Sequence, residues 1–292
     1  MLMKLYKRYA SYLGIFVLLC FSFFYTEKAV DIIRKNDPVM KQIKEEASKY
    51  EIDPVNAYIF GDEIVSGLNG KKVNIEKSFN EMKKINQYRS SMLVFDEVIP
   101  TTPLEEQYDK YVIQGNSSKS QVALIFKIDD MTYLDQLVNI LSDKEVVATF
   151  FMDGELVEQN MDTVSKLASS GYEIENLGYQ GRYSSDKFQW TNNMITSLTK
   201  KNTNYCYTDY KDSNIIDLCS KNSMYTIKPT ISTGSYPFLS IKKNLENGSL
   251  ISFNMTEATL KELPSIISYI RQKGYDIETI TNVISERRNE DK

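Results

Sequence analysis

Four acidic side chains are the groups in this sequence most able to hold a metal ion. Asp129 and Asp130 follow one apolar run, and Asp153 and Glu155 follow the next. Sites in barrels of parallel strands form just past the strand ends, and carboxylates alone suit Mg²⁺, Ca²⁺ or Mn²⁺ better than Zn²⁺. We nevertheless favour a simpler interpretation, in which these acids are solvated in loops or cap helices.

The chain has no histidine among its 292 residues. Histidine is the usual general acid or base near neutral pH and the commonest metal ligand. Its absence excludes a Ser-His or Cys-His nucleophile and a histidine-based zinc site. The three cysteines, Cys20, Cys206 and Cys219, form no CxxC motif, which excludes a cysteine-based zinc site.

Cys206 and Cys219 are the two cysteines that follow the apolar N-terminal segment. They can pair with each other or stay as two separately buried thiols, and the sequence leaves both interpretations open. A disulfide closing a loop of this size would stabilise the fold by about 3 kcal/mol in the chain-entropy model.

Nucleic acid is not an expected partner, because the formal net charge is −4 and the sequence pI is near 5.2. Three residues are candidates for contact with a sugar: Asn176, Asn254 and Trp190. Amides can hydrogen-bond to hydroxyl groups, and an indole offers a flat apolar face for a sugar ring. We favour turn or capping roles for the two asparagines and helix packing for the tryptophan.

Residues 9–26 are predicted to form a transmembrane anchor. They carry no charge, and a bilayer span needs roughly 17–25 apolar residues. Lys4, Lys7 and Arg8 precede the segment, so the N-terminus should be cytoplasmic and the C-terminal domain extracellular. A cleaved signal peptide is the alternative, but residues 22–26 are bulkier than a cleavage site requires. The sequence therefore indicates a single-pass membrane protein.

Residues 27–118 are predicted to form a small juxtamembrane α+β module. Residues 37–50 are expected to be a helix opened by Asp37 and Pro38, residues 92–95 a buried strand, and residues 100–103 a linker. We favour a stalk that packs against the main domain over a separate recognition module, since no charge cluster or motif singles out a surface.

From residue 119 onward, apolar runs of strand length alternate with helical patterns. The expected strands lie at residues 121–126, 146–151, 172–174, 250–253 and 275–280. One expected helix spans residues 134–141, with a capping-box-like start at Thr132 and Asp135. A second follows Asn160, and a third has Pro264 in its first turn. This alternation favours an α/β fold with a parallel sheet or barrel. Residues 287–292 form a charged tail.

Five stretches in this half resemble the polysaccharide deacetylase family, also called the NodB-homology domain. They are VALIF at 122–126, VATFF at 147–151, GYEIEN at 171–176, GSLISF at 248–253 and LPSIISYIRQKGYDIETI at 263–280. They occur in the family's order and span about residues 119–286. The resemblance implies a distorted (β/α) barrel with fewer than eight repeats, with a groove at the carboxyl ends of the strands.

The family's reactive positions are substituted in this chain. The family removes an N-acetyl or O-acetyl group from a glycan, using an Asp and two His to hold a metal that activates water. A second Asp acts as the base and a later His as the acid. The matching positions, in the order base, metal Asp, two metal His and the final His-Asp, are Lys127, Ile128, Leu177, Gly181, Phe253 and Asn254. The wall of the family's groove falls near residues 205–209, without its Arg or Pro.

These observations predict a membrane-anchored, extracytoplasmic protein whose deacetylase-like barrel no longer catalyses and needs no cofactor. Its expected role is to bind or organise cell-wall or surface polysaccharide. One alternative is a metal-dependent carbohydrate deacetylase that holds a divalent cation at a shifted site around Asp129 and Asp130. A second alternative is a structural scaffold for a protein partner.

Overall fold

The computed structural model describes residues 12–13, 16–18, 22 and 34–288. The chain divides into two compact units, one from Met1–Asp53 with Gly70–Val98 and the other from Pro54–Asn69 with Ile99–Lys292. Within the described residues, no helix is long and apolar enough to cross a membrane. Most of the predicted anchor at residues 9–26 lies outside the described residues.

The first unit is a small module with a core of its own. Its elements are α2 (Pro38–Glu46), η1 (Ala47–Lys49), β3 (Gly70–Val73), α3 (Ile75–Lys83), η2 (Ser90–Met92) and β4 (Phe95–Val98). The side chain of Asp37 caps α2 by accepting the Val39 N–H at 2.9 Å. One face of each helix is apolar, so Ile43 of α2 and Met82 of α3 are buried in one cluster.

The buried strand predicted at residues 92–95 is wrong. Residues 90–92 form the short 3₁₀ helix η2, and β4 begins only at Phe95. The strand β4 pairs antiparallel with β3, and its side chains are mostly exposed. Leu93 is buried individually, because it turns inward onto the core of the first unit. A short apolar run can therefore be divided between a turn and an exposed strand, which periodicity alone does not distinguish.

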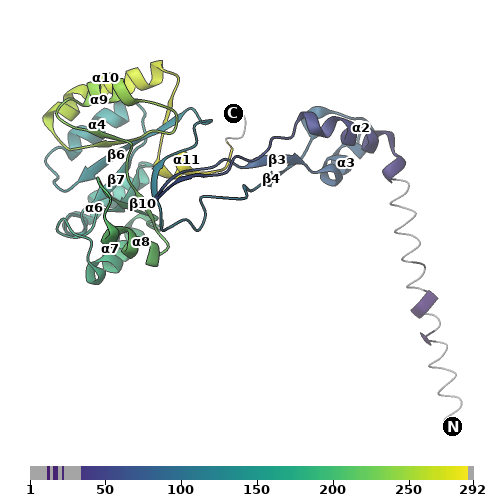
Figure 1. Ribbon diagram of the computed structural model, residues 1–292, viewed down its shortest axis with the longest axis horizontal. Coiled ribbons are helices and arrows are strands. Elements are labelled where there is room, and N and C mark those ends of the chain that lie inside the picture. The colour runs from purple at the N-terminus through teal and green to yellow at the C-terminus, as the bar shows by residue number, and fades with distance from the viewer. Residues whose placement is uncertain (1–11, 14–15, 19–21, 23–33, 289–292) are drawn as a thin grey trace, which may run out of the picture. The chain divides into compact units, whose positions relative to one another are not determined.

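The second unit is a distorted barrel of strands with helices around it (Figure 1). Its strands are β1 (Tyr58–Phe60), β2 (Glu63–Val65), β5 (Tyr111–Gln114), β6 (Gln121–Ile128), β7 (Thr149–Met152), β8 (Glu173–Asn176), β9 (Tyr205–Tyr207), β10 (Tyr225–Ile227), β11 (Ile231–Thr233), β12 (Leu250–Phe253) and β13 (Asp276–Glu278). Its helices are α4 (Leu134–Asp143), α5 (Gly154–Gln159), α6 (Met161–Ser169), α7 (Ser185–Thr199), α8 (Ser213–Lys221), α9 (Pro237–Asn244), α10 (Glu257–Gln272) and α11 (Ile280–Ile284).

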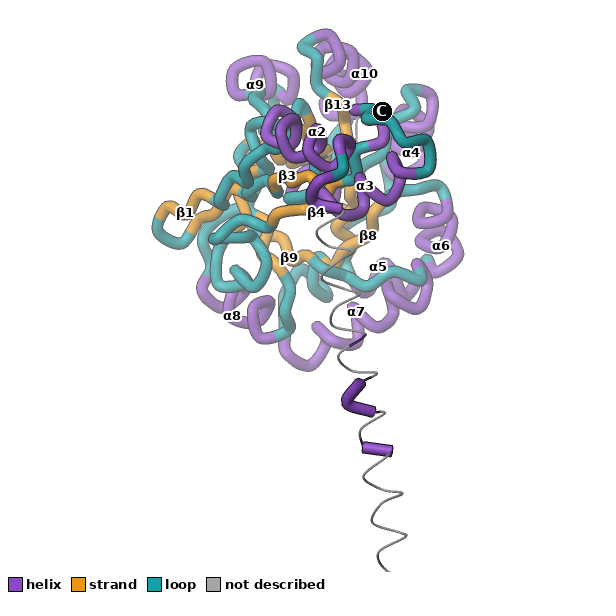
Figure 2. The backbone as a smooth tube through the Cα atoms, turned by 90° about the vertical axis from the view of Figure 1, so that its right-hand side faces the viewer, coloured by secondary structure: helices purple, strands orange, loops and turns teal. Residues whose placement is uncertain are grey.

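The strands form two curved sheets, ordered β11-β12-β6-β7-β8 with β13 also on β6, and β1-β2-β5-β10-β9. All of these pairs are parallel except β1 with β2. Figure 2 shows β8 and β9 near the centre, the helices α4, α6, α7, α8, α9 and α10 around the periphery, and β1 projecting at one edge. The predicted α/β barrel is thus confirmed, and its helices follow its strands as the crossovers of parallel strands require.

The two faces of β6 separate the barrel interior from the layer beneath the helices. Ala123 and Ile125 belong to the interior cluster, whereas Phe126 and Ile128 belong to the larger cluster between strands and helices. Successive side chains of a strand point to opposite faces, so this division follows the two-residue period. Lys127 continues the interior row at the carboxyl end of the strand.

Two side chains bridge the interval between β8 and β9, which belong to different sheets. The Glu175 carboxylate accepts the backbone N–H groups of Asn204 and Tyr205 through one oxygen, at 2.9 and 3.0 Å. Nearer the other end, the Tyr183 hydroxyl donates to the Asn176 carbonyl at 2.7 Å and accepts the Tyr207 N–H at 2.8 Å. Side-chain groups here occupy positions that a strand ladder would otherwise fill.

The boundary predicted at residue 118 does not match the two units. Residues 54–69 and 99–118 belong with the barrel, because β2 pairs in parallel with β5 and buries Ile64 in the interior cluster. Glu286 also accepts the Gly67 N–H at 2.7 Å, which ties this segment to the end of the barrel. A Cβ at Gly67 would lie 2.5 Å from the Val55 carbonyl oxygen, so only glycine fits there. Three short strands carry too little periodicity to reveal such long-range pairing.

One helix start and one helix cap differ from the predictions, although α4 begins at Leu134 as expected. The helix α10 begins at Glu257, where the Thr256 side chain accepts the Thr259 N–H, and Pro264 lies inside the helix. The buried face of α10 continues on both sides of the proline, so packing sustains the helix despite the missing N–H. No side chain caps α4, because the Thr132 hydroxyl donates to Asp130 instead.

Candidate functional site

A groove of about 670 Å³ lies at the carboxyl ends of the barrel strands. Its lining comes from the ends of five strands and the loops that follow them, and includes Lys127, Asp129, Asp153, Leu177, Gly181, Arg182, Tyr183, Tyr207, Asp209, Tyr210, Asp212 and Asn254. Parallel strands all end at the same rim, so residues distant in sequence meet there. The structure thereby brings together six of the residues singled out from the sequence: Lys127, Asp129, Asp153, Leu177, Gly181 and Asn254.

Lys127 is held on the inner side of the groove by an ion pair. Its Nζ lies 2.8 Å from Asp209 Oδ2 and 5.2 Å from the centre of the Tyr207 ring. The Lys127 side chain is only 19% exposed, whereas that of Asp209 is 44% exposed. The lysine stem is therefore packed, while the charged end is fixed by an acid and an aromatic face.

A hydroxyl network fixes Asp209 in turn. The Tyr207 hydroxyl donates to Asp209 Oδ1 at 2.6 Å and lies 2.7 Å from the Ser252 hydroxyl. Burial, followed by the hydrogen bond to Asp209, raises the pKa of Tyr207 well above its usual value, so the phenol stays a neutral donor. Sequence reasoning noted residues 205–209 as a wall but missed this network, because it joins β9 to β6 and β12.

Two of the substituted positions do not face the groove. Ile128 and Phe253 are fully buried in the cluster beneath the helices, and the Phe253 ring stacks on Phe126 with centroids 5.0 Å apart. Lys127 and Asn254, the neighbours of these two residues, line the groove instead. The two-residue period of a strand separates the members of each pair.

Asp129 and Asp130 are separated by the chain direction after β6. Asp129 lines the groove, but Asp130 accepts the Thr132 N–H at 2.7 Å in a local turn and is not part of the lining. Hydrogen bonds from the Thr132 hydroxyl and N–H lower the pKa of Asp130. The two aspartates therefore do not face one site, and the turn role expected as the simpler interpretation describes Asp130.

Asp153 and Asn176 organise loops at the rim. Asp153 is buried, and its two oxygens accept the N–H groups of Glu155 and Gly181, each at 2.9 Å. Asn176 is fully buried and accepts the Gly178 N–H at 2.6 Å. Both side chains hold loops of the protein itself, and Asn176 is not part of the groove lining.

Trp190 lies outside the groove lining. Its ring meets the Tyr179 ring edge-on with centroids 5.5 Å apart, and Lys187 Nζ lies 4.5 Å from the tryptophan ring centre. Lys187 also lies 4.4 Å from the Tyr179 ring centre. The rings and the lysine pack on one another, as expected for helix packing.

The structure joins Cys206 and Cys219 by a disulfide between β9 and α8. The Cα atoms lie 6.4 Å apart, and both residues are fully buried. Phe188 and Met224 pack around the bridge. The disulfide fixes β9, and β9 carries Tyr207 into the groove.

A divalent metal of the kind the resemblance implies does not fit these residues. The three positions that would supply its ligands hold Ile128, Leu177 and Gly181, none of which has a donor side chain. Among the described residues, no group of three or more His, Cys, Asp or Glu side chains is placed to hold an ion. The Lys127 ammonium adds a fixed positive charge at the same strand end, which would repel a cation.

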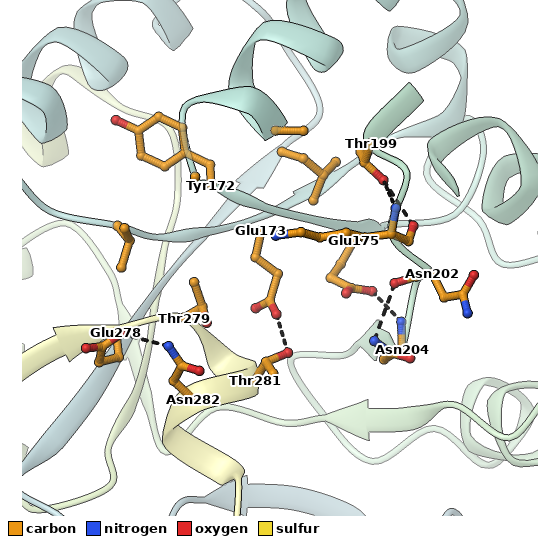
Figure 3. Close-up of a pocket in the computed structure, with 15 residues that line it drawn as sticks. Tyr172, Glu173, Glu175, Thr199, Asn202, Asn204, Glu278, Thr279, Thr281 and Asn282 are labelled. Carbon is orange, nitrogen blue, oxygen red and sulfur yellow. Dashed lines mark hydrogen bonds between the residues drawn. The ribbon is translucent and has the colours of Figure 1, made fainter. Parts of the chain in front are cut away.

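A second pocket, of about 620 Å³, lies at the opposite, amino ends of β8 and β9 (Figure 3). Glu173 and Glu175 point into it, but Glu173 accepts the hydroxyls of Thr149 and Thr281, and Glu175 bridges to β9. Burial raises the pKa of Glu173, and burial together with the Glu173 charge raises the pKa of Glu175 well above its usual value. These acids serve the internal structure of the barrel.

Comparison with known proteins agrees with the fold and the altered groove. Residues 114–214 match the family model described as polysaccharide deacetylase. Wild-type BA3943 of Bacillus anthracis, described as a CE4 family pseudoenzyme, is 25% identical with a TM-score of 0.66, and the match covers 87% of this chain and 97% of that one. The chain therefore contains a polysaccharide-deacetylase-like domain. Its resemblance to that family is thereby confirmed.

Three further proteins are similar to this deacetylase-like protein. The uncharacterized protein YlxY of Bacillus subtilis is 29% identical over 282 residues, which cover 89% of this chain and 87% of that protein. A BA3943 mutant described as having restored enzymatic activity matches with a TM-score of 0.66 and 25% identity, over 86% of this chain and 99% of that one. PdaA of Bacillus subtilis, a family 4 carbohydrate esterase, is 17% identical with a TM-score of 0.54, covering 61% of this chain and 86% of that one, and shares the fold.

Proposed function

We propose that this deacetylase-like protein binds cell-wall or surface glycan in its groove without hydrolysing it. The observation that supports the proposal is that the groove is still open and polar, while the positions expected to bind a metal hold Ile128, Leu177 and Gly181. Hydrolysis in this family needs a metal to polarise the carbonyl and activate water. Binding needs only shape, hydrogen-bond donors and aromatic surface.

A similar protein supports the proposal that the groove binds a saccharide. One pseudoenzyme of similar structure regains activity in a mutant form, so its scaffold is still able to receive a substrate. By analogy, loss of the reactive residues in this chain is compatible with retained recognition of a saccharide. The exposed Tyr210, at the mouth of the groove, offers a ring face for that contact.

We also propose that recognition takes place outside the cytoplasmic membrane. The predicted anchor at residues 9–26 would place the barrel on the extracellular side. The Cys206–Cys219 disulfide supports this location, since disulfides persist in oxidising compartments.

The test is co-sedimentation of the full chain, solubilised in detergent, with purified bacterial wall glycan. Tyr210→Ala changes an exposed residue of the groove and should weaken binding by up to about tenfold, since a stacked aromatic side chain contributes roughly 0.5–1.5 kcal/mol. Tyr236→Ala is the matched control, because Tyr236 is equally exposed but lies outside the groove lining.

Three results would contradict the proposal. Failure of the unaltered chain to sediment would favour a scaffold for a protein partner. Equal loss in both variants would mean that binding does not involve the groove. Release of acetate from the glycan, dependent on an added divalent ion, would favour the deacetylase alternative at Asp129 and Asp130.

A further inference from the structure

The pocket at the amino ends of β8 and β9 opens where one sheet of the barrel ends and the other begins. Glu173 and Glu175 are two residues apart on β8, so their side chains lie on the same face of that strand. Figure 3 shows both carboxyl groups directed into the pocket, one toward Thr281 and the other toward Asn204. A single strand therefore presents two acids to the same enclosed space.

One oxygen of Glu175 has no partner in the protein. Its Oε2 atom accepts the N–H groups of both Asn204 and Tyr205, and within the part of the chain that the structure describes Oε1 accepts no hydrogen bond. The side chain as a whole is only 2% exposed. A buried carboxylate oxygen without a donor is costly, so Oε1 points to a donor that enters the pocket.

The protein supplies no cation to neutralise these two acids. Among the described residues, neither Glu173 nor Glu175 forms an ion pair. Burial, followed by the Glu173 charge, raises the pKa of Glu175, because nothing nearby offsets the like charge. Three glutamates against the exposed Lys201 leave the pocket lining with a formal charge of −2. The pocket is thus suited to a positively charged ligand.

A metal ion does not match the groups that the pocket offers. Within the described residues, no three His, Cys, Asp or Glu side chains are placed to hold an ion. A hard cation such as Ca²⁺ takes about six to eight oxygen ligands, and both oxygens of Glu173 already accept from the hydroxyls of Thr149 and Thr281. The volume of about 620 Å³ also far exceeds that of a bare ion. These features favour an organic cation.

The free oxygen and the apolar part of the lining narrow the choice of organic cation. Glu175 offers only Oε1, so a guanidinium cannot form its two parallel hydrogen bonds to that carboxylate. A primary ammonium is a compact charge with three donors, and one donor is enough to satisfy Oε1. Val147 and Ala168 are half-buried aliphatic residues of the lining, and an alkyl stem can pack against them.

We propose that this pocket is a binding site for a primary ammonium group carried on a short alkyl stem. Glu175 accepts a hydrogen bond from the ammonium through Oε1, and Glu173 supplies a second negative charge beside it. The pocket lies at the end of the barrel opposite to the groove. The inference therefore goes beyond the proposed function and does not depend on it.

The experiment is isothermal titration calorimetry of the full chain, solubilised in a non-ionic detergent, with n-butylammonium chloride at neutral pH. We expect a dissociation constant of about 1 mM, as suits a small ligand held by one charged contact and a short stem. The neutral 1-butanol has the same stem without the charge. It should bind at least about tenfold more weakly, since a hydrogen bond to a charged group is lost.

Two glutamine variants remove the charges and keep the internal hydrogen bonds. Glu175→Gln still accepts from β9, and Glu173→Gln still accepts from the two threonine hydroxyls. Each should weaken binding of n-butylammonium at least about tenfold. Glu286→Gln is the matched control, because Glu286 also accepts a backbone N–H and has a pKa raised by burial, but lies outside the pocket lining.

Two sources of the ammonium are separated by two further ligands. Butane-1,4-diamine represents a free alkyl amine, and a short peptide with a central lysine represents a side chain of a partner protein. Tighter binding of either one, lost in both glutamine variants, supports the ammonium site and identifies the source.

Three results would overturn the inference. The first is equal binding of n-butylammonium and 1-butanol. The second is an affinity for n-butylammonium that is unchanged in both glutamine variants, or that falls equally in Glu286→Gln. The third is binding of calcium chloride more tightly than n-butylammonium with loss in both glutamine variants, which would make the pocket a metal site.

Discussion

Replacing Glu175 by glutamine is expected to change how the free energy of unfolding varies with pH, and to change its value little at acid pH. Glu175 is 2% exposed and accepts two backbone N–H groups from the start of β9. A glutamine carbonyl oxygen can accept the same two hydrogen bonds without a charge. The variant therefore keeps the bridge between β8 and β9 and removes only the titration.

The direction in which the free energy of unfolding changes with pH follows from the raised pKa of Glu175. Burial, followed by the neighbouring Glu173 charge, holds the pKa of Glu175 well above the usual 4.5 in the folded chain. The stabilisation associated with the protonated form is complete below the unfolded value of 4.5 and is lost as the pH rises through the folded value. Each unit by which the folded value exceeds the unfolded one corresponds to about 1.4 kcal/mol. Glu175→Gln should therefore gain stability relative to the unaltered protein as the pH rises.

Glu175→Ala measures how much the bridge between β8 and β9 contributes to the free energy of unfolding. It leaves two backbone N–H groups without their acceptor, and each unsatisfied group costs roughly 1–3 kcal/mol when buried. We expect a loss of about 2–6 kcal/mol in the free energy of unfolding at acid pH, twice the cost of a single unsatisfied N–H. The loss should shrink as the pH rises, because this variant also lacks the titrating carboxyl.

The assay is urea unfolding followed by tryptophan fluorescence at a series of pH values. The chain has one tryptophan, Trp190, which lies in α7 of the barrel unit, so its signal reports on that unit. Glu278→Gln is the control, since Glu278 lines the same pocket and has no part in the bridge. Parallel stability curves for Glu175→Gln and the unaltered protein would show that Glu175 does not titrate as described, and the reasoning would be refuted.

Three further changes have defined outcomes. Replacing Cys206 and Cys219 by serine should lower the free energy of unfolding by about 3 kcal/mol, since the disulfide closes a short loop. The measurement is urea unfolding under non-reducing conditions, and an unchanged free energy of unfolding in the double-serine variant would argue against it. Burial lowers the pKa of Lys119 to about 8, so the folded chain binds fewer protons than the unfolded one between about pH 8 and 10.5, and stability should rise with pH across that window. Lys119→Met should abolish that rise, and an unchanged slope would contradict the assignment. Gly248→Ala should destabilise the fold by about 1–3 kcal/mol in thermal unfolding, because φ is +77° and the added Cβ would lie 2.3 Å from the Gly115 carbonyl oxygen; an unchanged melting temperature would show that this turn relaxes freely.

Much of the barrel could be predicted from local pattern. The strand at residues 250–253 lies where it was expected, and β6 extends the expected strand at 121–126 by two residues. Both are continuous apolar runs, which is the signature of strands buried on two faces. The strand expected at 146–151 is shifted to Thr149–Met152, and β8 begins one residue late and extends to Asn176. Element ends depend on caps and neighbours, which the local pattern does not contain.

The parts that were missed are those defined by distant contacts. The strands β9, β10 and β11 have three residues each, too few for a periodic signal. The segments around β2 and β5 looked like part of a stalk because their partners in the barrel lie far away in sequence. The Lys127–Asp209 pair and the Glu175 bridge likewise join residues from different strands.

The amino-acid sequence by itself determined which chemistry is missing. A chain without histidine, with Lys127, Ile128, Leu177 and Gly181 at the reactive positions, lacks the side chains for the family's metal site whatever its fold. Residue identity is sufficient for that conclusion, because a missing donor atom cannot be supplied by geometry. Only the tertiary structure decided which of these substitutions face the groove. Closure of the barrel buries Ile128 and Phe253 beneath the helices and places Lys127 beside Asp209, since the alternation of a strand has meaning only once the strand's two faces are known.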